Sequence, residues 1–143
     1  MNKFKLKSST TNVSADRSIL LIEKLLTNFG ADKIYKQYLT DGKCTSIQFM
    51  LDKKGYKLPA NIDGVFNVLF KRGSHTQSRD LKAYNVSWRI IANWVHSQLS
   101  IIASGQAQPD EVLLPYMYNG KQTFFEAYKS GNLMLSSGDE NND

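Results

Sequence analysis

The chain has 143 residues, of which 41% are hydrophobic and 22% are charged. This length and apolar content are typical of one globular domain that buries its own core. Cys44 is the single cysteine, which excludes an internal disulfide. One cysteine and two histidines in the whole sequence are too few for a structural zinc site. We therefore expect no metal and no cofactor.

The formal net charge of +5 is spread unevenly along the chain. Basic residues outnumber acidic ones over residues 1–17 and most densely over residues 71–89, whereas the C-terminus reads SSGDENND. We expect a flexible basic arm at 1–13, one globular α+β domain at 14–130 and a disordered acidic tail at 131–143. Because no signal peptide and no run of 18 apolar residues is visible, we expect a cytoplasmic protein that does not enter a membrane.

A helix and a hairpin are predicted at the start of the domain. Ser14 is a favourable N-cap for a helix whose apolar residues recur at helical spacing. The dipeptide Asp41-Gly42 then predicts a two-residue type I′ turn, which pairs Lys36 with Ile47.

A third strand completes an antiparallel meander. The dipeptide Lys54-Gly55 predicts the second turn and places Leu58 opposite Leu51. One face of the sheet is expected to pack on helices, and it carries Ile34, Tyr38, Ile47, Phe49 and Leu51. The opposite face, which includes Cys44, is more polar and is expected to be partly solvated.

Three more helices are predicted after the sheet. Asn61 caps a short helix that Gly73 ends, and residues 78–104 form a long helix with Ser78 as its N-cap. Pro109 at the first helical position begins another short helix. The predicted fold is therefore α+β in the order α-βββ-α-α(long)-α, with the three-stranded meander packed against the helices.

The long helix carries two apolar stripes. The first consists of Leu81, Tyr84, Trp88, Ile91, Val95, Leu99 and Ile102. The second, Ile90, Trp94 and Ile101, lies about 120° around the helix. Two stripes need two partners, so we expect one to cover the sheet and the other to meet a neighbouring helix or to form the interface of a homodimer.

Basic and amide side chains gather at the start of the long helix and along its polar face. They are Lys71, Arg72, Arg79, Lys82, Asn85, Arg89 and Asn93. Lysine and arginine neutralise phosphates and asparagine amides donate hydrogen bonds to them, so this set predicts a binding site for DNA or RNA. The alternative interpretation is an ordinary solubilising surface.

Catalytic motifs are not visible in the sequence. It has no glycine-rich phosphate loop, no metal-ligand spacing and no nucleophile elbow. Cys44 is expected to be an ordinary strand residue, and His96 a solvated or hydrogen-bonded one. We therefore expect a protein that is not an enzyme and has no catalytic residues.

One constellation resembles small proteins carried by bacteriophages and integrated mobile elements. It comprises Ile62, VFNVL at 65–69, WR at 88–89, WV at 94–95, QL at 98–99, GQA at 105–107 and VLLPY at 112–116, and the likeness covers residues 17–128. Those proteins are functionally undefined, so the resemblance implies no site residue. It implies an intracellular phage context, and it favours two classes of role, the handling of DNA or RNA and the binding of a host protein. We take nucleic-acid binding as the leading function. The alternative is a protein-interaction module, either a modulator of a host protein or a homo-oligomeric structural protein.

Overall fold

The computed structural model describes residues 4–71 and 73–131, and it has the predicted α+β order. The first elements are α1 (Ala15–Phe29), β1 (Asp32–Tyr38), β2 (Cys44–Leu51) and β3 (Lys54–Pro59). They are followed by α2 (Ile62–Phe70), α3 (Gln77–Ala103), α4 (Pro109–Leu113), the 3-10 turn η1 (Leu114–Tyr116) and α5 (Phe124–Lys129). The predicted order is confirmed, and η1 and α5 are additions to it.

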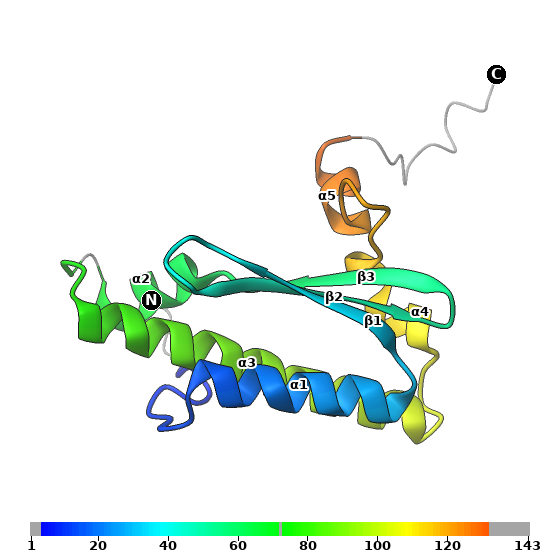
Figure 1. Ribbon diagram of the computed structural model, residues 1–143, viewed down its shortest axis with the longest axis horizontal. Helices are drawn as coiled ribbons and strands as arrows, with labels where there is room; N and C mark the ends of the chain where they lie inside the picture. The colour runs from blue at the N-terminus through cyan, green and yellow to red at the C-terminus, as the bar shows by residue number, and fades with distance from the viewer. Residues whose placement is uncertain (1–3, 72, 132–143) are drawn as a thin grey trace.

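The sheet and two long helices form two layers (Figure 1). The strands pair antiparallel in the order β1-β2-β3, and α1 and α3 lie side by side across one face of this sheet. Helix α2 packs beside the N-terminal part of α3, whereas α5 lies on the other side of the sheet. The main core therefore lies between the sheet and the α1–α3 pair.

Helix α1 begins and ends where the local chemistry predicts. The Ser14 hydroxyl accepts a hydrogen bond from the Arg17 backbone N–H at 3.2 Å, which satisfies one of the unpaired donors of the first turn. Gly30 ends the helix in the left-handed region with φ 111°. The helix buries Ile19, Ile22 and Leu26 in the core.

The first hairpin turn is longer than the sequence predicts. The Gly42 N–H donates to the Leu39 carbonyl at 2.9 Å, and the Leu39 N–H donates to the Lys43 carbonyl at 2.9 Å. Gly42 has φ 89°, whereas Asp41 is not among the residues with positive φ. A type I′ turn needs positive φ at both central residues, so the predicted type is wrong, and the loop is a three-residue turn that ends in a glycine bulge.

The second turn lies two residues earlier than predicted. Asp52-Lys53 form it, with φ values of 55° and 67°, which are the signs that a type I′ turn needs. The prediction at Lys54-Gly55 is wrong because these residues already belong to β3. Leu58 consequently pairs with Ile47 and not with Leu51.

The predicted register of the first hairpin is confirmed in the middle of the strands, but it shifts next to the turn. Lys36 pairs with Ile47 as predicted, but a shift between Gln37 and Tyr38 brings Tyr38 opposite Cys44. Tyr38, predicted to face the core, is 50% exposed. The extra residue changes which side chains face the helices, as a bulge does in an antiparallel pair.

Cys44, predicted for the solvated face, is completely buried. Its backbone N–H donates to the Tyr84 hydroxyl at 2.8 Å, and its carbonyl accepts from the Trp88 indole N–H at 3.0 Å. Side chains of α3 therefore form hydrogen bonds with both the N–H and the carbonyl of Cys44, the first residue of β2. The strand residues Ile47, Phe49 and Leu51 are buried as predicted.

Both ends of the α2–α3 connection differ from the prediction. Lys71 ends α2 in the left-handed region with φ 36°, two residues before the predicted Gly73. Thr76 caps α3, because its hydroxyl accepts from the Arg79 N–H at 3.2 Å, and Ser78 already lies inside the helix. Thr76 and Ser78 are both good capping residues, and helix ends are uncertain by about one or two residues.

The first apolar stripe of α3 packs into the core, and Trp94 of the second stripe has a partner within the chain. Tyr84, Trp88, Val95 and Leu99 of the first stripe are buried, whereas Leu81 is 54% exposed. From the second stripe, the Trp94 ring meets the Tyr116 ring edge to face, with centroids 5.4 Å apart.

Within the described residues, no helix is long and apolar enough to cross a membrane.

Candidate functional site

Residues 4–13, the described part of the predicted arm, lie across the face of α3 that is turned away from the sheet (Figure 1). The Asn93 side-chain amide donates to the Ser8 hydroxyl at 3.2 Å. At the start of α1, the Ala15 N–H donates to the Asn85 side-chain carbonyl at 2.9 Å. Two predicted phosphate donors, Asn85 and Asn93, therefore hold the N-terminal segment on α3.

Four cations lie on the two segments that make these contacts. Lys5 and Lys7 are exposed on the arm, close to Ser8 along the chain. On α3, Arg89 precedes Asn93 by one turn, and Lys82 is exposed two turns before Arg89. We call Lys5, Lys7, Lys82 and Arg89 the arm–helix surface. In the described part of the chain, no carboxylate oxygen lies within 4.0 Å of any of their charged nitrogens.

The other predicted cations are separate from this surface or already engaged. Arg79 donates from Nη1 to the Ser74 carbonyl at 3.1 Å, and its guanidinium lies 5.1 Å from the centre of the Phe70 ring. Arg79 thus contacts both the α2–α3 loop and the end of α2. Lys71 is exposed at the end of α2, and Arg72 lies outside the described residues.

A polar cleft opens between the arm and α3. Its volume is about 330 Å³. It is lined by Thr10, Thr11, Asn12, Ser78, Leu81, Lys82 and Asn85. None of these side chains is acidic, so the cleft continues the positive potential of the arm–helix surface.

His75 of the α2–α3 loop pairs with Asp80 in the first turn of α3, and no sequence motif predicts this pair. His75 Nδ1 lies 2.6 Å from Asp80 Oδ1, and the imidazole stacks on the Phe66 ring with centroids 3.8 Å apart. The pair fixes the loop against α2 and the first turn of α3. Within the described residues, no group of three histidine, cysteine or acidic side chains is arranged to hold a metal ion.

Cys44 is not placed as a nucleophile. Burial raises the pKa of its thiol above the usual value, and this favours the neutral form. The thiolate is the reactive species, so the burial that pairs Cys44 with α3 also makes its sulfur inert.

The predicted interface residues are only partly brought together. Ile90 and Trp94 line a groove of about 150 Å³ with Leu58, Pro59, Ile91 and Tyr116. Ile101 is half-buried elsewhere on α3. Tyr116 of the same chain is in ring contact with Trp94.

Lys5 and Lys7 were not predicted as members of a site. The signal available for them was the positive charge of residues 1–17, which does not say where that charge lies. Their position depends on a contact between residues 85 apart in sequence, and no local pattern predicts it.

No family model matches the chain, and neither a curated protein nor a solved structure does.

Proposed function

We propose that the protein is a non-enzymatic nucleic-acid-binding protein that holds the sugar–phosphate backbone of DNA or RNA on the arm–helix surface. The observation that supports this most is the hydrogen bond between Ser8 and Asn93, because it places Lys7 beside the turn of α3 that carries Arg89. In the described part of the chain these cations have no ion-pair partner within 4.0 Å, so phosphates can provide one.

The helix gives part of this surface a fixed spacing. Lys82 and Arg89 are seven residues apart on one rigid helix, so they lie about 10 Å apart along its axis. That distance is close to the rise along the duplex axis over three base pairs, at about 3.4 Å per base pair. The arm lysines would form a second row beside the first. A backbone-directed interaction of this kind binds many sequences with similar affinity.

The setting that we propose is the cytoplasm of a phage-infected host, which is the context implied by the resemblance to phage-borne proteins. The alternative function is a protein-interaction module or homodimer that uses Ile90, Trp94 and Ile101. We place it second, because Trp94 has an aromatic partner in η1 of its own chain.

A salt titration tests the proposal. Short labelled single- and double-stranded DNA and RNA should bind at about 50 mM salt and dissociate as salt rises, since binding releases counterions from the phosphates. The double variant Lys82→Gln and Arg89→Gln should lower affinity for all sequences and reduce the slope of log affinity against log salt by about 1 to 2. Fluorescence anisotropy measures both quantities.

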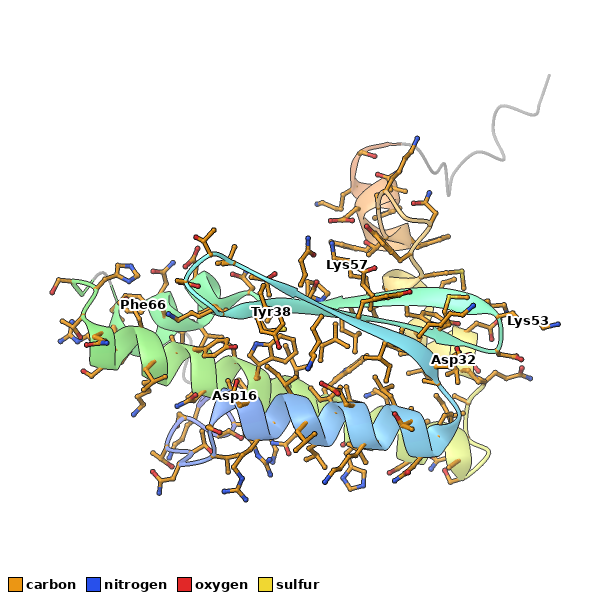
Figure 2. All side chains as sticks on the ribbon, viewed as in Figure 1. Asp16, Asp32, Tyr38, Lys53, Lys57 and Phe66 are labelled. Atoms are coloured by element: carbon orange, nitrogen blue, oxygen red, sulfur yellow. The ribbon has the colours of Figure 1, made fainter. Side chains whose placement is uncertain are left out.

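The matched control removes the same charge at a distant place. Figure 2 shows Lys53 at the end of the β2–β3 hairpin, away from the N-terminal part of α3. Lys121 is exposed in the turn before α5. The double variant Lys53→Gln and Lys121→Gln should bind nearly as wild type does. Absence of binding by wild type to all four nucleic acids would contradict the proposed function, and equal losses in both double variants would move the site elsewhere.

A further inference from the structure

The cleft of the arm–helix surface has two walls from distant parts of the chain. Residues 10–12 of the arm form one wall, and residues of the first turns of α3 form the other. Its volume of about 330 Å³ lies within the range of pockets that hold small organic ligands, roughly 300–1,000 Å³. The cleft is therefore large enough for one compact polar unit, but not for a duplex.

Three side chains of this cleft, those of Thr11, Asn85 and Lys82, have donors to offer. The Thr11 hydroxyl oxygen accepts from the Val13 N–H at 3.1 Å, which leaves its own proton to donate. The Asn85 carbonyl accepts from Ala15, so its NH₂ group remains available. Lys82 adds an ammonium group with three donors. A ligand rich in acceptor oxygens and negatively charged suits this set, as a phosphate and its sugar are.

Leu81 adds an apolar contact to an otherwise polar cleft. It belongs to the stripe of α3 that covers the sheet, yet its side chain is 54% exposed. An apolar side chain beside phosphate-binding groups is suited to one face of a nucleobase, since extruded bases pack on aromatic and apolar side chains.

From this combination we infer that the cleft receives one unpaired nucleotide, and that the protein therefore selects single-stranded nucleic acid over duplex. The inference rests on the proposed function and names its substrate class. Lys82 and Asn85 contact the phosphate and sugar, and Leu81 contacts the base. In a duplex the base is paired and stacked, so bringing it to Leu81 costs a few kcal/mol of unpairing that a single strand avoids.

The test compares one sequence as a single strand and as a duplex, in DNA and in RNA, at one salt concentration. Wild type should bind the single strand more tightly in fluorescence anisotropy. Leu81→Ser should weaken single-strand binding by about fivefold and leave duplex binding unchanged, because the duplex contacts only the cations. Leu81→Ala is a second variant that removes most of the apolar surface and keeps a strong helix former.

The matched control is Leu20→Ser on α1. Leu20 is 50% exposed, similar to Leu81, but it does not line the cleft. This variant should keep the wild-type ratio of single-strand to duplex affinity, and thermal unfolding should show all three variants folded.

The outcomes separate the two proposals. Equal affinity of wild type for single strand and duplex, or an unchanged ratio in both Leu81 variants, would overturn the inference while leaving nucleic-acid binding in place. Absence of binding to every nucleic acid would overturn both. Loss of single-strand binding alone in the Leu81 variants supports the inference.

Discussion

The two faces of α3 are built in opposite ways. Toward the sheet, Tyr84 and Trp88 are buried. The Tyr84 hydroxyl accepts a hydrogen bond from the Cys44 N–H, and the Trp88 indole donates one to the Cys44 carbonyl. Toward the arm, Asn85 and Asn93 each make one hydrogen bond to the N-terminal segment. The four cations of the arm–helix surface form no ion pair with an acidic residue in the described part of the chain. The first face stabilises the fold, and the second leaves charge available for a ligand.

The largest effect is expected on the sheet side. Trp88→Ala should lower the free energy of unfolding by about 3–5 kcal/mol, because it leaves a cavity and removes the partner of the Cys44 carbonyl. Chemical denaturation measures the loss. The control Trp94→Ala should cost clearly less, since Trp94 is only half-buried. Equal losses in the two variants would contradict the assignment of Trp88 to the core and Trp94 to its edge.

Removing a single oxygen on the same face should have the next largest effect. Tyr84→Phe leaves the buried Cys44 N–H without an acceptor, which costs about 1–3 kcal/mol of unfolding free energy. Tyr35→Phe is the matched control, because Tyr35 is 63% exposed and its change should stay within about 0.5 kcal/mol. If both variants were as stable as wild type, the hydrogen bond from Cys44 would contribute nothing.

On the arm side, Asn93→Ala should change stability by about 1 kcal/mol or less, because one hydrogen bond at the surface is lost. Its main effect should be on the arm. Hydrogen exchange of residues 5–13 should become faster. Under the proposed function, nucleic-acid affinity should also fall as Lys5 and Lys7 leave the surface. Ser100→Ala, on the same helix but without an arm contact, is the control. Unchanged exchange in Asn93→Ala would show that the arm is held by other contacts.

The smallest effect concerns an ion pair outside both faces. Lys36 Nζ lies 2.7 Å from Glu23 Oε2, and the hydrogen bond to this carboxylate raises the pKa of Lys36 above its usual 10.5. A lysine pKa raised by folding adds stability below the unfolded-state pKa, and this contribution is lost as pH rises through the folded-state pKa. Solvent screens the pair, so Lys36→Met should differ only slightly from wild type at neutral pH. The sign of the shift would be wrong if that difference grew at strongly alkaline pH.

The elements that the sequence predicted correctly depend on neighbouring residues. The Ser14 hydroxyl caps α1 by accepting from the N–H of Arg17, three positions later. Pro109 is the first residue of α4. The turn at Asp52-Lys53 was missed because it contains no glycine, and the usual signal for a type I′ turn is Asn-Gly or Asp-Gly. Cys44 was assigned to the wrong face because strict alternation does not reveal a bulge, and the extra residue lies in β2 itself, opposite the step from Gln37 to Tyr38.

The sequence predicts which residues of the candidate site share a face of α3, but it does not predict what those residues contact. Lys82 and Arg89 share the arm-facing side of α3, as the helical period predicts. The period also places Asn85 and Asn93 there, but their partners are residues of the arm rather than groups outside the chain. Helical spacing assigns a side chain to a face and cannot identify a neighbour that is distant in sequence.

The hydrogen bond between Ser8 and Asn93 also fixes when this surface can exist. Its two ends are separated by 85 positions, whereas β1 and β2 pair across a short loop. A ribosome delivers the arm first and Asn93 much later, so an emerging chain can form the first hairpin long before the arm has a docking place. The complete positive surface therefore arises only after most of α3 has been synthesised.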